Sequence, residues 1–296
     1  MDLILHLGAH RTGSTALIRC FGKNVGNLTA AGTAIRPPES LRAVPDFSPV
    51  PDLARRAAGG DVTAGERLSA VRDRLAADVR AVARAGARRL VLSDENMIGT
   101  MLPSLKARLL YPDAALRLAA YAAVLPQPPA LVAIAVRTLA TWWPSVYGYV
   151  LPRHPLTPFG ALTDALADSG RGWTDVVADL RGVFPGIPVL IWRQESFAQD
   201  MTRVVAALAG LPGPEGLERV AARIKEAHLR KQGDRIHELR RSDPALAGPE
   251  LEARLAMMGD AKGRSLGFRP PQRAALDALY QTDLDALRAQ PGVTLI

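Results

Sequence analysis

The stretch LILHLGAHRTGST at residues 3–15 decides the fold of this 296-residue chain. Its apolar start predicts a short buried strand. Two glycines, Gly8 and Gly13, predict a tight loop that leads from the strand into a helix. Such a loop turns backbone N–H groups toward one point at the N-terminus of the helix, where a phosphate-like anion binds. We call residues 8–15 the anion loop.

The anion loop differs at one position from the loop of nucleoside triphosphatases. That loop has the sequence G-x-x-x-x-G-K-[ST], and Gly8 and Gly13 have its spacing. Ser14 stands in place of the lysine, and the basic residue is instead Arg11. We therefore expect an anion other than the β- and γ-phosphates of ATP.

Composition and charge describe a globular chain with a basic excess. Hydrophobic residues make up 48% and charged residues 22%, which suits an α/β protein with a buried core. The net charge is +8, but aromatic residues are only 5%. Arginines alternate with acidic residues, so we expect no nucleic-acid partner. The single cysteine, Cys20, fits a reducing compartment, and no targeting segment is evident, so we expect a cytoplasmic protein.

Residues 114–136 are apolar enough to raise the question of a membrane span. Arg117 and a cluster of prolines (Pro126, Pro128 and Pro129) interrupt the stretch well short of the ~20 residues that a span requires. We expect a helix, a turn and a buried strand here, and no membrane span.

Four short apolar runs predict buried parallel strands at residues 3–7, 90–93, 131–136 and 189–192. Helical patterns lie between them, most clearly at residues 66–84. We expect an α/β, three-layer, P-loop-like fold: a central parallel sheet of four to five strands flanked by helices. Residues 1–296 form one expected domain with a mainly helical C-terminal part. Residues 37–51 are proline-rich and predict an irregular surface loop.

Ligands of such sheets bind at the carboxyl ends of the strands. His10 and Arg11 follow the first run, and Glu95 follows the second beside Asp94 and Asn96. Glu95 is a candidate general base, although an ordinary glutamate has a pKa of about 4.3 and burial would have to raise it. The alternative is that Asp94 or Asn96 caps the next helix.

The two later runs lead into further candidates. Arg137 leaves the third run, and Ser145 lies about two helical turns beyond it, so both could bind a second anion. Trp192, in the fourth run, either stacks on a base or closes the core. The aromatic residues after Arg137 either line a pocket or pack as core: Trp142, Trp143, Tyr147 and Tyr149.

Taken together, these segments resemble the sulfotransferase family, whose members transfer a sulfuryl group from 3′-phosphoadenosine 5′-phosphosulfate (PAPS). Arg11-Thr12-Gly13-Ser14-Thr15 is similar to that family's 5′-phosphosulfate loop. Arg137 and Ser145, eight positions apart, are similar to its 3′-phosphate motif. Lys262-Gly263-Arg264 resembles its late basic loop over the same phosphate; the alternative is a solvated loop. Residues 276–284 resemble the C-terminal helix of bacterial members.

The resemblance implies roles for the same residues. These motifs would bind PAPS as cofactor, and Arg11 would stabilise the leaving 5′-phosphate. Glu95 resembles the base of carbohydrate sulfotransferases, with His10 as the rival base. Trp142, Tyr147 and Tyr149 would shape the pocket of the acceptor. The acceptor would be a small molecule or glycan with a hydroxyl or amine, and no metal would be needed.

The chain also departs from the family pattern. Arg11 stands where many members have lysine, Ala16 and Leu17 stand where an aromatic residue often follows, and Gln194 stands for a frequent tyrosine. Two other functions therefore remain as alternatives: a P-loop nucleotide kinase or nucleotidase, and a catalytically silent protein that binds 3′-phosphoadenosine 5′-phosphate (PAP). The sequence leaves the acceptor and the oligomeric state open.

Overall fold

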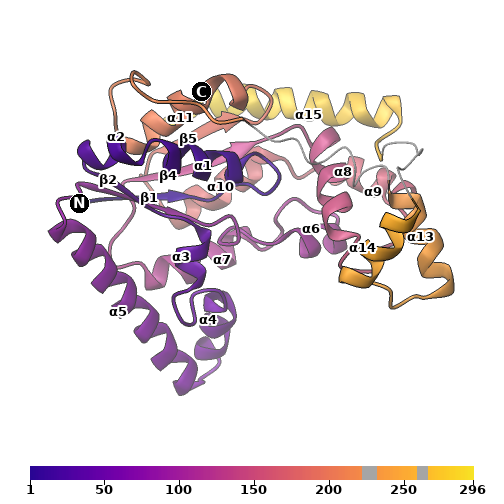
Figure 1. Ribbon diagram of the computed structural model, residues 1–296, viewed down its shortest axis with the longest axis horizontal. Coiled ribbons are helices and arrows are strands. Elements are labelled where there is room, and N and C mark those ends of the chain that lie inside the picture. Colours follow the sequence, from indigo (N-terminus) through magenta and orange to yellow (C-terminus); the bar gives the residue numbers. More distant parts are fainter. Residues whose placement is uncertain (222–231, 259–265) are drawn as a thin grey trace.

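The computed structural model describes residues 1–221, 232–258 and 266–296. Six parallel strands form one sheet in the order β2-β3-β1-β4-β5-β6 (Figure 1). The four central strands are the four predicted runs, so the expected α/β fold with a parallel sheet is confirmed. The strands are β1 (Asp2–His6), β2 (Thr33–Arg36), β3 (Arg89–Ser93), β4 (Leu131–Val136), β5 (Val189–Arg193) and β6 (Val293–Leu295).

The predicted strand count was slightly low because both edge strands were missed. β2 has four residues and β6 has three, and most of their side chains are only half-buried. An edge strand pairs on one side only, so it needs no continuous apolar run to form. Apolar periodicity therefore found the buried centre of the sheet and not its borders.

Helices connect the strands and cover the sheet. They are α1 (Ser14–Lys23), α2 (Val25–Ala30), α3 (Pro38–Arg42), α4 (Val50–Ala58), α5 (Val62–Arg84), α6 (Met101–Ala107), α7 (Ala114–Val124), α8 (Leu139–Val150), a 3-10 turn (Phe159–Ala161), α9 (Thr163–Ala167), α10 (Trp173–Val183), α11 (Phe197–Ala209), α13 (Gly233–Ser242), α14 (Gly248–Met257) and α15 (Pro270–Arg288).

The helix predicted at residues 66–84 is α5. It begins four residues earlier than predicted because Asp61 caps it, accepting a hydrogen bond from the Ala64 N–H at 3.0 Å. Residues 114–136 form α7, a turn and β4, as expected. In the part of the chain that the structure describes, no helix has both the length and the apolarity to cross a membrane.

The sheet is buried on both faces, which makes three layers. Along β1, Leu3 and Leu5 pack into one apolar cluster with residues of α5, α7, α10 and α15. Ile4, between them, packs into a second cluster with residues of α1 and α11. This alternation follows from the two-residue period of a strand. It explains why the central strands are apolar at nearly every position.

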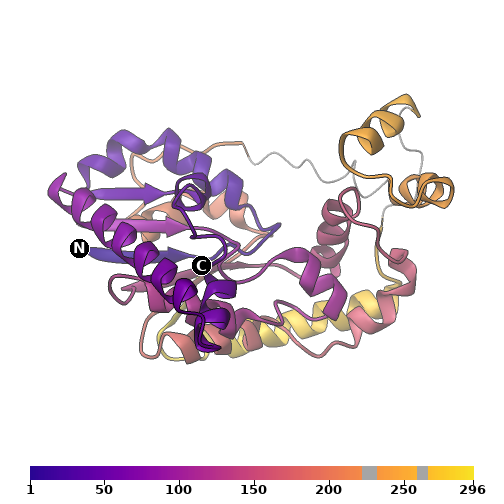
Figure 2. The ribbon, with the colours of Figure 1, turned by 90° about the horizontal axis from the view of Figure 1, so that it is seen from below.

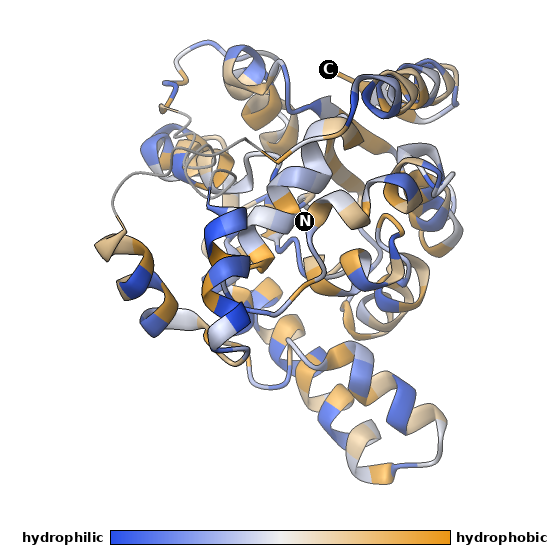
Figure 3. Cartoon of the chain, turned by 90° about the vertical axis from the view of Figure 1, so that its right-hand side faces the viewer, coloured by the Kyte–Doolittle hydropathy of each residue, from blue (hydrophilic) through white to orange (hydrophobic). Residues whose placement is uncertain are grey.

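The expectation of an irregular surface loop at residues 37–51 is wrong. The segment contains α3 and leads into α4, and it buries Leu41, Phe47 and Val50. Pro38 stands in the first turn of α3, where a missing N–H does no harm. α4 and α5 project together below the sheet (Figure 1), with polar and apolar residues mixed along them (Figure 3).

Helices α13 and α14 lie at the end of the molecule away from the sheet (Figure 2). The buried Arg240 of α13 attaches them to the chain that follows α8. Its guanidinium donates to the carbonyls of Leu151 at 2.7 Å, His154 at 3.0 Å and Leu246 at 2.8 Å. Burial lowers the pKa of Arg240, because these partners are carbonyl groups without a full negative charge.

Candidate functional site

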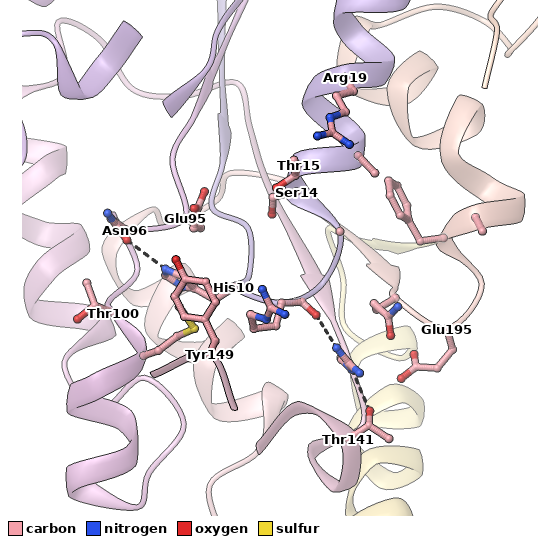
Figure 4. Close-up of a pocket in the computed structure, with 18 of the residues that line it drawn as sticks. His10, Ser14, Thr15, Arg19, Glu95, Asn96, Thr100, Thr141, Tyr149 and Glu195 are labelled. Atoms are coloured by element: carbon pink, nitrogen blue, oxygen red, sulfur yellow. Dashed lines mark hydrogen bonds between the residues drawn. The ribbon is translucent and has the colours of Figure 1, made fainter. Parts of the chain in front are cut away.

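One cavity of about 930 Å³ lies where the four central strands end (Figure 4). Each central strand contributes to it: the segments after β1, β3, β4 and β5 all line it. The sequence predicted that these four segments would meet, and the structure brings them together. The lining residues are His10, Arg11, Gly13, Ser14, Thr15, Ala16, Arg19, Arg42, Glu95, Asn96, Thr100, Met101, Arg137, Thr141, Tyr149, Gln194, Glu195, Phe197 and Ala198.

The anion loop leads directly into α1. No side chain caps this helix, and its first turn carries the partial positive charge of a helix N-terminus. Ser14 and Thr15 line the cavity. Thr12 does not, because its side chain is buried and its hydroxyl donates to the Ala9 carbonyl at 2.6 Å. Thr12 therefore fixes the loop from within.

Both loop glycines are required by the packing around them. Gly13 has a φ of 103°, and a Cβ atom there would lie 2.9 Å from the ring of Phe197. Gly8 has a φ of 87°, and its Cβ would lie 2.6 Å from the Cβ of Glu95. Residues with a side chain rarely adopt these conformations. The glycines thus let Phe197 and Glu95 approach the loop closely.

Two arginine side chains fix the loop, Arg11 from within it and Arg137 from the end of β4. Arg137 is 7% exposed; its guanidinium donates to the Arg11 carbonyl at 2.7 Å and to the Thr141 hydroxyl at 2.9 Å. Arg11 donates from Nε to the Ser145 hydroxyl at 3.1 Å, and its guanidinium carbon lies 5.0 Å from the centre of the Tyr149 ring. Arg11 and Arg137 both line the cavity, as predicted for residues that bind anions.

Besides Thr12, three more expected site residues lie elsewhere, which corrects the prediction. Ser145 is only 2% exposed and lies behind Arg11 rather than on the cavity wall. Trp142 is fully buried and donates from its indole N–H to the His10 carbonyl at 2.8 Å. Tyr147 is fully buried as well, and its hydroxyl donates to the Thr157 carbonyl at 2.9 Å. α8 turns these residues into the core, and of the residues predicted on this helix Tyr149 remains at the cavity.

Glu95 lines the cavity beside an ion pair whose carboxylate, that of Asp94, is buried. Asp94 accepts two hydrogen bonds from Arg42, at 2.6 and 3.0 Å, and Arg42 also reaches Glu95 at 3.3 Å. Burial opposes ionisation of Glu95, but the charge interactions with His10 and Arg42 outweigh it, so its pKa is lowered. The condition set from the sequence, that burial raise the pKa of Glu95, is therefore not met, because the sequence did not show that Arg42 lies nearby.

Asp94 and Asn96 do not cap a helix, which was the alternative for this segment. The Asp94 carboxylate accepts the Asn96 N–H at 2.9 Å and closes a turn instead. The next helix, α6, begins only at Met101. The turn leaves the side chains of Glu95 and Asn96 on the cavity wall.

His10 is hydrogen-bonded at both ring nitrogens. Its Nε2 lies 3.0 Å from Asn96 Oδ1, which only accepts, so Nε2 carries the proton. Its Nδ1 lies 3.0 Å from the Tyr111 hydroxyl, which also accepts the His10 backbone N–H at 2.9 Å. The Tyr111 proton therefore goes to Nδ1. Burial lowers the pKa of His10, so this residue is a neutral, fully bonded imidazole rather than a free base.

The segment after β5 closes the opposite wall. Glu195 accepts the Thr138 N–H and the Tyr280 hydroxyl, both at 2.9 Å, so both of its oxygens have protein donors. Trp192 is buried and stacks on His6 with 5.5 Å between the ring centres. Of the two alternatives for Trp192, the structure shows the core position. The aromatic side chain that meets the cavity here is Phe197.

Sequence reasoning missed Arg42, Arg19, Thr141 and Phe197 as cavity residues. Arg19 carried an available signal, because it lies one helical turn beyond Thr15 and hence on the same face of α1. Arg42 carried none, since it lies in the proline-rich segment. The predicted loop residues Lys262, Gly263 and Arg264 lie outside the described residues.

Within the described ranges, no three His, Cys, Asp or Glu side chains gather into a group that could hold a metal ion. Comparisons of the chain with protein-family models, curated proteins and solved structures found no match. The function therefore has to be argued from the geometry of the cavity.

Proposed function

We propose that this protein is a sulfotransferase that moves a sulfuryl group from PAPS to a hydroxyl or amine and releases PAP. One observation carries the proposal: a single cavity joins the anion loop, with Arg11 and Arg137 beside it, to a separate carboxylate, Glu95. The loop and its cations suit a phosphosulfate anion. The carboxylate suits an acceptor that must lose a proton.

The cavity fits a donor of this size and charge. Its volume lies within the range of about 300–1,000 Å³ that is typical of ligand pockets. Four arginines and two glutamates line it, so its charge balance favours a polyanion: Arg11, Arg19, Arg42 and Arg137 against Glu95 and Glu195. The loop N–H groups and Arg11 would hold the 5′-phosphate, and Arg137 the 3′-phosphate.

The residues divide the chemistry between them. PAPS supplies an activated sulfuryl group when it is bound. Glu95 would accept the proton that the acceptor loses as its oxygen or nitrogen bonds to sulfur and the sulfur–oxygen bond to the 5′-phosphate breaks. Arg11 and the loop N–H groups would stabilise the charge left on that phosphate. His10 would not compete with Glu95 for the proton, because Tyr111 already donates to Nδ1.

The acceptor would lie on the Glu95 side of the cavity, where Asn96, Thr100, Met101 and Tyr149 form the wall. These residues offer an aromatic ring, an amide and a hydroxyl, which suit a small polar molecule or a glycan. A cytoplasmic location completes the proposal.

Calorimetric titration tests the proposed donor. We expect PAP to bind at micromolar concentrations and Mg·ATP not to bind, because Ser14 replaces the lysine that would contact its β- and γ-phosphates. Adenosine 5′-phosphate, which lacks the 3′-phosphate, is the matched control and should bind more weakly than PAP. Binding of ATP but not PAP would overturn the proposal in favour of a kinase or nucleotidase. Binding of PAP without transfer to any acceptor would indicate a silent binding protein.

A further inference from the structure

Arg42 divides its guanidinium unequally between two carboxylates. Its Nε and Nη2 donate to Asp94 at 3.0 and 2.6 Å, whereas the same Nη2 reaches Glu95 at 3.3 Å. The Asp94 side chain is 2% exposed, and that of Glu95 is 23% exposed. Paired, charge-assisted hydrogen bonds are the stronger ones. Arg42 therefore pairs mainly with Asp94, and Glu95 receives the weaker share of it.

The backbone fixes both partners before any ligand binds. Asp94 directly follows β3, and its N–H donates to the His6 carbonyl at 3.1 Å, which continues the pairing of β1 with β3. Arg42 is the last residue of α3, a helix that packs on β3 and buries Leu41. The packing of α3 on β3 thus places the guanidinium at the cavity, and no ligand is needed to place it there.

We propose that Arg42 and Asp94 are positioning residues for Glu95, and that Asp94 keeps the guanidinium from pairing fully with the base. This rests on the proposed function, in which Glu95 is ionised before the transfer and neutral after it. Asp94 keeps Arg42 paired in both states. When Glu95 takes up a proton, Arg42 still has the Asp94 carboxylate as its counter-ion. Without Asp94, the transfer would leave Arg42 unpaired, and the cost of that unpaired charge would oppose the transfer.

Charged and titratable groups face Glu95 from several elements. His10 comes from the anion loop, Arg42 from α3 and Asp94 from the end of β3. Arg19 of α1 lies on the opposite side of the cavity (Figure 4). His10 and Arg42 both favour the ionised form of Glu95, and of the two Arg42 is the one that keeps its charge at every pH of the titration. A closer Arg42 should therefore lower the pKa of Glu95, and removal of Arg42 should raise it.

The test follows the side-chain carboxyl carbon of Glu95 by NMR as the pH of the ligand-free protein is varied, with Glu95→Gln identifying the signal. In Arg42→Gln the midpoint should rise by about one unit, because a neighbouring cation is lost. In Asp94→Asn it should fall, because Arg42 becomes free to pair with Glu95. Arg42→Lys keeps the charge and should raise the midpoint less than Arg42→Gln does. The exposed Arg55→Gln on α4 is the matched control and should leave it unchanged.

Equal midpoints in Arg42→Gln and wild type, or shifts of Arg42→Gln and Asp94→Asn in the same direction, would overturn the proposal. If Asp94→Asn does not fold, the two Arg42 variants decide. Equal midpoints in Arg42→Gln and Arg42→Lys would then overturn the proposal. In turnover, the acid limb of kcat/KM should follow the NMR midpoint in each variant, whereas a merely structural defect would lower kcat without moving that limb. Opposite NMR shifts without sulfuryl transfer in the wild type would support the electrostatic arrangement and reject the proposed function.

Discussion

The anion loop and the group around Glu95 line the same cavity but are held by different means. The loop is a backbone structure: Gly8 and Gly13 set its path, and the uncapped start of α1 supplies its N–H groups. Glu95 depends instead on side chains: its neighbour Asp94, and Arg42 and His10 from distant segments. The loop should therefore tolerate most side-chain changes outside its glycines and arginine. The Glu95 group should not tolerate changes in charge.

The largest expected effect is on the Glu95 side. Glu95→Gln should lower turnover by about 10²–10⁴-fold, because it removes the proposed general base. PAP affinity, measured by calorimetry, should stay near the wild-type value. Glu195→Gln is the control within the same cavity: its carboxylate is already engaged by Thr138 and Tyr280. An equal loss of turnover in both variants would contradict a special role for Glu95.

On the loop side, the next largest effect is expected from Arg137. Arg137→Ala should weaken PAP binding by about 2–5 kcal/mol, as for the loss of one partner of a desolvated charge pair. Arg137→Lys should weaken it less, because lysine keeps the charge but not the two-pronged geometry. Calorimetry checks both. An unchanged affinity in Arg137→Ala would remove this residue from the binding site and make it a structural brace of the loop.

A third prediction concerns His6, which lies on β1 beneath both regions and bonds to Ser93 at 2.7 Å. Burial lowers its pKa from 6.5 to about 4. The unfolded chain binds a proton below about pH 6.5, whereas the folded chain keeps His6 neutral. The contribution of His6 to the free energy of unfolding should thus be fully present above pH 6.5. It should be lost as the pH drops toward 4, which lowers the free energy of unfolding by up to about 3 kcal/mol.

Urea unfolding at a series of pH values checks this prediction. In His6→Leu the decline between pH 6.5 and 4 should be shallower than in the wild type, whatever the absolute stability of the variant. His10 and His237, whose pKa values burial also lowers, contribute to the part that remains, as do carboxylates with lowered pKa values such as Asp61. An identical decline of the free energy of unfolding in the two proteins would show that His6 is not a buried neutral group in the folded chain.

The smallest effect compares two glycines with positive φ. Gly13→Ala should destabilise the protein by about 1–2 kcal/mol more than Gly86→Ala, because only Gly13 would also press a Cβ against Phe197. Gly86 has a φ of 94° and open space around it, so its variant reports the backbone effect alone. Urea unfolding measures both. Equal destabilisation would mean that Phe197 moves aside and that the loop is less tightly packed than the structure shows.

The four central strands, α5 and the anion loop were predictable because each is determined by residues close together in the chain. Strand burial repeats with a short period, and the loop needs two glycines at a fixed spacing. The carboxyl-end rule then placed Arg11, Glu95 and Arg137 in one cavity. The edge strands and α3 were missed because short, partly exposed elements leave little pattern in the sequence.

By itself, the sequence determined which residues follow each buried strand, and so placed Arg11, Glu95 and Arg137 at the cavity. Tertiary structure alone decided which of these groups are hydrogen-bonded and how their pKa values shift. Arg42 reaches Asp94 across 52 positions of the chain, and Tyr111 reaches His10 across 101. Whether His10 is free or bonded, and whether the pKa of Glu95 rises or falls, depends on such partners. A charge or hydrogen bond acts over a few ångströms in space, and spacing along the chain does not specify that distance.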